Sequence, residues 1–280
     1  MRPSPFLLGR VHTIVFTDLD GTLLEHDDYS FEAARPALAR MARDGVPLVL
    51  CTSKTRAEIE ALRATLANEH PFISENGGAA FIPRGYFPFD VAGAETRGAY
   101  LALVQGAPYA DVVAALHRAS LSSGVPVRGF AQMSDAEVAE ATGLPLHEAH
   151  LARQRDFDEP FEILGAAGSE RLLEAIEREG MRWTAGGRFH HILGDGDKGS
   201  AVRALSALYR RRWGHDAVTT VGLGDAPNDA SFLAVVDIPI VVASPRADSL
   251  RALVPRARLT TRPGPAGWNE AVLSVLEDGR

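Results

Sequence analysis

The sequence predicts an α/β fold with a parallel sheet, on three observations. Short apolar runs alternate with amphipathic stretches in the first 85 residues, and the same rhythm returns in the last 85 or so. The strand-like runs are apolar almost throughout, as expected of strands that are buried on both faces of a sheet. A segment of different pattern separates the two parts. We therefore expect a Rossmann-like parallel-sheet core (residues 1–84 and 194–280) with an inserted α/β domain (residues 85–193).

Each expected element of the core has a local cause. β-Branched and apolar runs predict the strands, Gly45 ends the first helix, and Thr55 with Glu58 forms a capping box at the start of the second. Pro36 should delay or kink the first helix. In order, the core should contain strand Val11 to Thr17, helix Phe31 to Asp44, strand Val46 to Thr52, helix Thr55 to Ala67, strand Phe72 to Glu75, a helix after Lys198, strand Ala217 to Leu223, a short helix after Pro227, strand Ile238 to Val242 and a helix near Trp268 to Leu276.

The inserted segment mixes helical and strand-like periodicity, and Ser134 with Glu137 forms a second capping box. Its helices should be Ala110 to Ser122, Asp135 to Thr142 and Ser169 to Glu179, and its strands Val125 to Phe130, Phe161 to Leu164, Met181 to Thr184 and Arg188 to Leu193. This composition predicts a separate domain of mixed build.

Composition narrows the function. The net charge of -7 argues against a general nucleic-acid binder, which needs a basic face. The single cysteine, Cys51, lies in an apolar run and reads as a buried structural thiol. With no secretory leader pattern and no apolar run of about 20 residues, we expect a cytoplasmic protein that binds no membrane. Only Lys54 and Lys198 are lysines among 29 basic residues, and codon usage explains the ratio but not these two places.

Acidic residues follow two of the predicted strands. Asp18-Leu19-Asp20-Gly21-Thr22 comes directly after the first strand, and Gly222-Leu223-Gly224-Asp225-Ala226-Pro227-Asn228-Asp229 begins in a later one. Parallel strands end at a common edge, where one carboxylate can attack phosphorus while another moves a proton. Carboxylate-rich surroundings suit Mg²⁺. The second segment also fits a helix start capped by Asp225 or Asn228, and the two interpretations are compatible.

The two lysines lie beside complementary segments. Thr52-Ser53-Lys54 ends the second strand and offers hydroxyl and backbone donors to a phosphate. Lys198 opens a helix, where its ammonium could neutralise a transferring phosphoryl group.

These four segments, in this order, resemble the motifs of the haloacid dehalogenase superfamily. The resemblance implies that Asp18 is the nucleophile, Asp20 the general acid/base, Thr52 the hydroxyl of the second motif and Lys198 the lysine of the third. It further implies a phosphatase that forms an aspartyl-phosphate and binds Mg²⁺ through Asp18, the Asp20 carbonyl, Asp225 and, directly or through water, Asp229. The inserted domain resembles the large α/β cap that selects the substrate in this superfamily, and Ser74-Glu75-Asn76-Gly77-Gly78 resembles the segment before such caps.

Other segments resemble the mannosyl-3-phosphoglycerate phosphatases: Thr52-Ser53-Lys54-Thr55, Gln154 to Phe161, Gly186 to His191 and Gly264 to Asn269. The resemblance implies hydrolysis of a small phosphorylated sugar with a carboxylate. The substrate-binding candidates are Ser53, Lys54, Arg155, Glu159, Arg188, His190 and Asn228, although a strand can turn only one of His190 and His191 to the cleft. Another sugar phosphate, a phosphomutase of the same fold and a catalytically silent sensor stay open, and the sequence does not indicate an oligomeric state.

Overall fold

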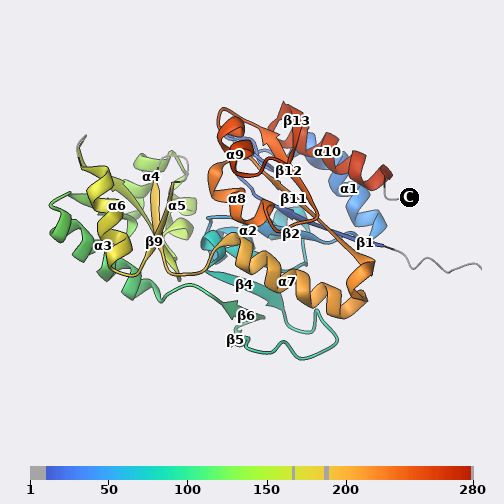
Figure 1. Cartoon of the computed structure of the whole chain (residues 1–280), viewed down its shortest axis with the longest axis horizontal. Helices are drawn as coiled ribbons and strands as arrows, with labels where there is room; N and C mark the ends of the chain where they lie inside the picture. The colour runs from blue at the N-terminus through green and yellow to red at the C-terminus, as the bar shows by residue number, and fades with distance from the viewer. Residues whose placement is uncertain (1–10, 166–167, 186–188, 279–280) are drawn as a thin grey trace, which may run out of the picture.

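The computed structural model describes residues 11–165, 168–185 and 189–278 and divides them between two lobes (Figure 1). A nine-stranded sheet forms the large lobe and a four-stranded sheet the small lobe. The strands of the large sheet are β1 (His12–Thr17), β2 (Leu48–Cys51), β3 (Phe72–Ser74), β4 (Ala79–Pro83), β5 (Glu95–Arg97), β6 (Tyr100–Val104), β11 (Val218–Gly224), β12 (Ile238–Ala243) and β13 (Arg258–Pro263).

The large sheet is parallel over most of its width. Its strands lie in the order β13-β12-β11-β1-β2-β3-β4-β6-β5, and those from β13 to β3 pair in parallel. The remaining three strands continue the sheet antiparallel. The predicted α/β class with a parallel-sheet core is confirmed.

Helices cover both faces of the large sheet (Figure 1). They are α1 (Arg35–Asp44), α2 (Arg56–Leu66), α7 (Lys198–Trp213), α8 (Ala230–Leu233), α9 (Ala247–Leu253) and α10 (Gly264–Asp278). The first apolar cluster joins α1, α2 and α10 to one face, and the second joins α7, α8 and α9 to the other. In β1, Val15 belongs to the first cluster and Phe16 to the second. Such strands are buried on both faces, which explains their continuous apolar runs.

Local signals fix the ends of the first helices. Thr55 and Glu58 form the predicted capping box of α2, with the Glu58 amide 3.2 Å from Oγ1 of Thr55 and the Thr55 amide 2.8 Å from Oε2 of Glu58. Gly45 ends α1 with a φ of 68°, which costs a glycine little. Pro36 lies in the first turn of α1, after a short 3₁₀ turn, so the regular helix begins late as predicted.

The small lobe consists of an antiparallel sheet, β7-β8-β10-β9, and its helices. The helices α3 and α6 pack on one face of this sheet. Its elements are α3 (Tyr109–Ser123), β7 (Val127–Gly129), α4 (Asp135–Thr142), α5 (Leu146–Ala152), β8 (Asp158–Ile163), α6 (Ser169–Arg178), β9 (Arg182–Ala185) and β10 (His190–Leu193). The short 3₁₀ helices of the chain are η1 (Glu32–Ala34), η2 (Glu75–Gly77), η3 (Phe130–Gln132), η4 (His215–Ala217) and η5 (Pro227–Asp229).

The structure contains elements that the sequence pattern did not predict. The expected division between residues 84 and 85 falls inside the large sheet, because β5 and β6 continue it. The chain enters the small lobe only after β6. The strand β5 has three residues and is largely exposed, so it leaves no apolar run, whereas β6 is apolar but only five residues long. The elements β4, α5, α9 and β13 were also missed.

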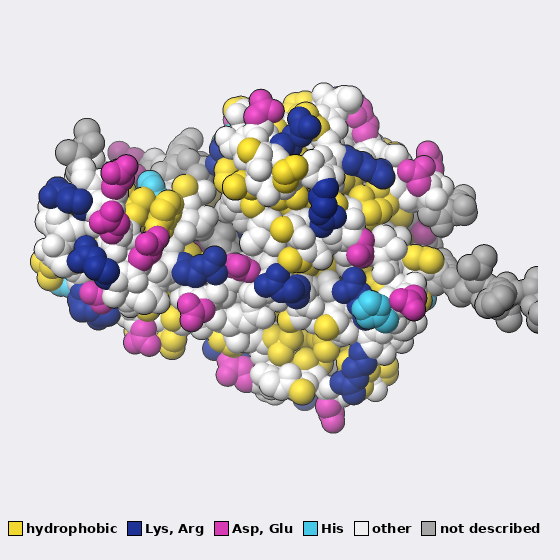
Figure 2. Space-filling model, in the orientation of Figure 1, with side chains coloured by type: hydrophobic (Ala, Val, Ile, Leu, Met, Phe, Trp, Pro, Cys, Tyr) yellow, Lys and Arg dark blue, Asp and Glu magenta, His cyan; other side chains and the backbone are white. Residues whose placement is uncertain are grey.

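Two further features limit the kinds of surface that the molecule offers. In the ranges that the structure describes, no helix is both long and apolar enough to cross a bilayer. On the face drawn in Figure 2, acidic and basic side chains are interspersed and do not gather into one basic patch.

Candidate active site

The carboxyl ends of two neighbouring strands bring three acids together. Asp18 directly follows β1, while Asp225 and Asp229 follow β11, which pairs with β1 in parallel. One carboxylate oxygen from each residue lies within 4.8 Å of the other two, and all three residues are buried. The two acidic motifs that the sequence singled out therefore form one cluster.

Lys198 at the start of α7 reaches the same cluster. Its Nζ lies 2.7 Å from Oδ1 of Asp18 and 2.7 Å from Oδ1 of Asp229, and its side chain is 1% exposed. Burial acts to lower the pKa of Lys198, but the two carboxylates outweigh it and raise the pKa, which keeps the ammonium charged. The lysine of the second half is thus a buried counter-ion of the acids.

One ammonium does not balance three carboxylates. Burial, followed by the nearby charge of Asp229, raises the pKa of Asp18 well above its ordinary value and that of Asp225 to about 7. The Asp225 carboxylate lies 3.3 Å from Oγ1 of Thr22 and 3.7 Å from a guanidinium nitrogen of Arg246. The surplus of negative charge and the oxygen-only donor set fit a divalent cation. This cluster could hold such an ion.

Asp20 occupies a second position at the same edge. Its Oδ2 lies 3.1 Å from Nζ of Lys54, and this ammonium also lies 4.7 Å from the centroid of the Tyr29 ring. Gly21, with a φ of 78°, turns the chain here, and a side chain on it would press on the carboxylate of Asp225. The two aspartates of the first motif therefore face different cations, Lys198 and Lys54.

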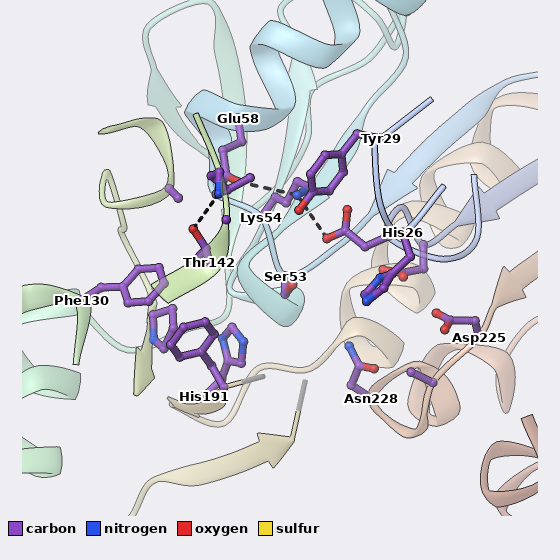
Figure 3. Close-up of a pocket in the computed structure, with 18 of the residues that line it drawn as sticks. His26, Tyr29, Ser53, Lys54, Glu58, Phe130, Thr142, His191, Asp225 and Asn228 are labelled. Carbon is purple, nitrogen blue, oxygen red and sulfur yellow. Dashed lines mark hydrogen bonds and ion pairs between the residues drawn. The ribbon is translucent and has the colours of Figure 1, made fainter. Parts of the chain in front are cut away.

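A cavity of about 310 Å³ extends from these acids to the small lobe (Figure 3). The large lobe contributes Asp18, Asp20, His26, Asp27, Tyr29, Ser53, Lys54, Glu58, Asp225, Ala226, Asn228 and Arg246. The small lobe contributes Phe130, Thr142, Gly143, Leu144, Ala152, Arg155, Pro160, Phe189 and His191. The acidic residues of the cavity lie on the large lobe, and the small lobe contributes Phe130 and Phe189.

The predicted residues of the large lobe all lie at this edge. Ser53, Lys54 and Asn228 line the cavity. Thr52 is buried at the end of β2, where its Oγ1 accepts a hydrogen bond from the Lys54 amide at 3.3 Å.

Two predicted residues of the small lobe face away from the cavity. Glu159 accepts hydrogen bonds from the Tyr109 hydroxyl at 2.7 Å and from the Ala131 amide at 2.8 Å. His190 lies opposite Phe161 in the register, with its ring 5.7 Å from that ring. Since adjacent strand residues point to opposite faces, it is Pro160 and His191 that line the cavity.

The remaining two candidates have different outcomes. Arg155 lines the cavity, but its guanidinium is already engaged, because it donates to the carboxylate of Asp158 and, at 2.8 Å, to the carbonyl of Ser53. Arg188 lies outside the described residues.

A buried polar junction joins the two lobes and was not predicted. The Glu75 carboxylate accepts hydrogen bonds from the amides of Asp156 at 3.0 Å, Phe157 at 2.7 Å and Asp158 at 3.0 Å. Asn76 donates to Oδ2 of Asp158 at 2.9 Å. Sequence reasoning singled out both segments, but their contact spans about 80 residues of chain and leaves no periodic signal.

Comparison with known proteins places this geometry in a family. Residues 15–85 match the model of the haloacid dehalogenase-like hydrolases. The chain is 40% identical over 265 residues to the glucosyl-3-phosphoglycerate/mannosyl-3-phosphoglycerate phosphatase of Methanococcoides burtonii, with 94% of this chain and 97% of that protein covered. It is 36% identical over 233 residues to the mannosyl-3-phosphoglycerate phosphatase of Pyrococcus furiosus, with 83% and 92% covered.

A solved structure shares the fold of both lobes. It is a phosphatase of the haloalkanoate (HAD) enzyme superfamily from Bacteroides thetaiotaomicron, with a TM-score of 0.65, 15% sequence identity and 99% of each chain covered. The sequence relatives, which match over most of both chains, identify the family more narrowly than the shared fold does. The chain belongs to the haloacid dehalogenase-like hydrolases, in the family of the mannosyl-3-phosphoglycerate phosphatases.

Proposed function

We propose that this chain is a Mg²⁺-dependent phosphatase that hydrolyses mannosyl-3-phosphoglycerate to mannosylglycerate and inorganic phosphate. The observation that carries the proposal is the buried group of Asp18, Asp225, Asp229 and Lys198 at the end of a cavity between the lobes. The names of the relatives support the choice of substrate.

In the first step, a carboxylate oxygen of Asp18 attacks phosphorus. Lys198 donates to Oδ1 of Asp18, which leaves Oδ2 as the attacking oxygen. The bond from Asp18 to phosphorus forms as the bond from phosphorus to the glycerate oxygen breaks. Asp20 in its acid form gives its proton to the departing oxygen, so the sugar product leaves as an alcohol.

In the second step, water attacks the aspartyl-phosphate. Asp20, now a carboxylate, removes a proton from the water while the bond between phosphorus and Asp18 breaks. Inorganic phosphate leaves, and both aspartates return to their starting forms. The pairing of Asp20 with Lys54 at 3.1 Å holds this carboxylate at the cavity wall and away from the buried cluster.

The carboxylates of Asp18 and Asp225 and the backbone carbonyl of Asp20 would hold the magnesium ion, with Asp229 directly or through water. When bound, the ion supplies positive charge that screens these acids and the phosphoryl oxygens from each other. Asp229 also has a structural role, because its Oδ2 accepts hydrogen bonds from the amides of Asp225 at 3.0 Å and Ala226 at 3.2 Å. These bonds fix the conformation of the loop that follows β11.

The two ends of the cavity suit the two ends of such a substrate. Lys54 and Arg246 lie on the large lobe and offer cations to a phosphoglycerate. The small lobe adds Phe130, Leu144 and Phe189, whose apolar surfaces suit the C–H face of a sugar ring. We propose on this basis that the small lobe is the substrate-selecting cap.

Phosphate release from a panel of esters tests the proposal. The panel contains mannosyl-3-phosphoglycerate, its glucosyl analogue, sucrose phosphate, mannose phosphates and 3-phosphoglycerate, each with Mg²⁺ and with EDTA. The mannosyl compound should be hydrolysed fast, and only with the metal. Phosphate release from another ester alone would refute the proposed substrate but not the proposed phosphatase chemistry. No release from any ester would refute the phosphatase activity.

A further inference from the structure

One ionisable side chain of the small lobe reaches the cavity in a fixed orientation. The Nδ1 of His191 lies 3.0 Å from Oδ2 of Asp158. An imidazole has only two ring nitrogens, so Nε2 is the one that remains for a ligand. Figure 3 shows the His191 ring pointing into the space that Phe130, Ser53 and Asn228 surround.

Asp158 is built to hold that ring. Its carboxylate is fully buried and accepts from both Arg155 and Asn76 in addition to His191. Burial alone would raise the pKa of Asp158, but Arg155 and then His191 hold it below its ordinary value. An ionised carboxylate only accepts hydrogen bonds, so the proton of the imidazole sits on Nδ1. In the neutral form of the ring, Nε2 is therefore an acceptor that faces the cavity.

The same carboxylate connects the ring to the large lobe. Asn76 belongs to η2 of the large lobe, and it donates from its side chain to Asp158 at 2.9 Å while its amide donates to the Thr52 carbonyl at 3.0 Å. Through Asp158 and Asn76, the orientation of His191 is therefore fixed relative to the large lobe, which carries the acids.

The surroundings of His191 narrow the chemistry of its ligand. Phe130 and Phe189 meet edge to face at 5.0 Å, and with Pro160 they line the cavity beside the histidine. An apolar wall next to one hydrogen-bond acceptor suits a group with a C–H face and hydroxyls at its rim. A sugar ring has this form, whereas a phosphate or a carboxylate would gain nothing from the aromatic wall.

We propose that His191 is a substrate-recognition residue that accepts a hydrogen bond from a hydroxyl of the sugar, and that Asp158 is the positioning residue that orients it. This inference rests on the proposed function, because it names the part of the site that selects the glycosyl group. It places sugar recognition on β10 of the small lobe, apart from the acids that carry the phosphoryl chemistry.

The chain offers a matched control at the next position. His190 has the same side chain on the same strand but faces Phe161 and Trp183, with ring centroids 5.7 and 6.3 Å away. The comparison of His191→Gln with His190→Gln separates the contact with the ligand from the general effect of losing an imidazole on this strand.

The test measures kcat and KM of both variants on mannosyl-3-phosphoglycerate and on an aryl phosphate that has no sugar, with thermal melting to check the fold. His191→Gln should lower kcat/KM on the glycosyl ester roughly 10- to 100-fold, mainly through KM, but less than about threefold on the aryl ester. Asp158→Asn should show the same selective loss of kcat/KM on the glycosyl ester, and kcat/KM of His190→Gln should fall little on either substrate.

Three results would overturn the inference. They are an unchanged kcat/KM of His191→Gln on the glycosyl ester, an equal loss on both esters, and an equal effect of His190→Gln. If the wild-type enzyme prefers another sugar phosphate from the panel, the comparison uses that ester. A wrong choice of substrate can then be distinguished from a wrong role for His191.

Discussion

Replacement of Asp18 by asparagine should abolish phosphate release and at the same time stabilise the metal-free fold. At an effective dielectric constant of about 20, each of the two carboxylates within 4.8 Å repels Asp18 by at least about 3.5 kcal/mol, and Lys198 at 2.7 Å attracts it by about 6 kcal/mol. Repulsion from Asp225 and Asp229 thus roughly cancels this attraction. The cost of burying the charge, several kcal/mol, remains.

The Asp18→Asn amide keeps an oxygen that can accept from Lys198 but carries no charge. In EDTA at pH 7 we expect the free energy of unfolding to rise by about 1–2 kcal/mol, which would raise Tm by roughly 2–8 °C. In excess Mg²⁺ the wild type should instead be more stable than the variant. At about 100 times its Kd a ligand stabilises the protein that binds it by about 2.7 kcal/mol, and the variant has lost one carboxylate ligand.

Thermal melting in EDTA and in excess Mg²⁺, paired with phosphate release, measures both effects. Asp216→Asn is the control, since it removes the same charge from an exposed side chain and should change stability by less than about 0.5 kcal/mol. A variant that melts below the wild type in EDTA would contradict the charge balance. Normal turnover would eliminate Asp18 as the nucleophile.

Three other perturbations test neighbouring parts of the structure. Lys54→Met should lower kcat roughly 10- to 100-fold in steady-state assays, because Asp20 loses its partner at 3.1 Å; an unchanged kcat would show that Asp20 needs no such support. Burial raises the pKa of Glu75 from 4.5 to about 7, so between these pH values the folded state binds a proton that the unfolded state has lost, and Tm should fall as the pH rises. Glu75→Gln should reduce this dependence of Tm on pH, and the same dependence in the variant would show that Glu75 is not its source. A Cβ at Gly77 would overlap the Asp197 carbonyl, so Gly77→Ala should lose at least about 3 kcal/mol in chemical denaturation, whereas Gly45→Ala, with open space around it, should lose about 1 kcal/mol.

The large lobe was predictable because its chemistry follows from topology. Asp18 and Asp225 are about 200 residues apart, yet each directly follows a strand, and parallel neighbours end at one edge. The apolar runs of β1 and β11 were strong enough to place both acids. The edge strand β5 lacks such a run and the short apolar run of β6 was not assigned to the core, so the expected domain boundary fell inside the sheet.

The small lobe was less predictable because its sheet has two different faces. A shift of one residue along β8 or β10 turns a side chain from the cavity to the packed face of the lobe. Sequence reasoning singled out the correct segments but chose Glu159 and His190, whereas the register places Pro160 and His191 at the cavity. Apolar residues on both sides of the histidine pair conceal the alternation.

The junction between the lobes shows why no local pattern could reveal the geometry of the cavity. Apolar surfaces tolerate sliding, but three successive amides that donate to Glu75 define one docking position, and Arg155 adds a further bond across the junction to the Ser53 carbonyl. Each group would be an unpaired buried charge or donor if the lobes were displaced. We infer that the junction fixes the distance between the acids and the cavity residues of the small lobe. Such a junction depends on residues that meet only after both lobes have folded.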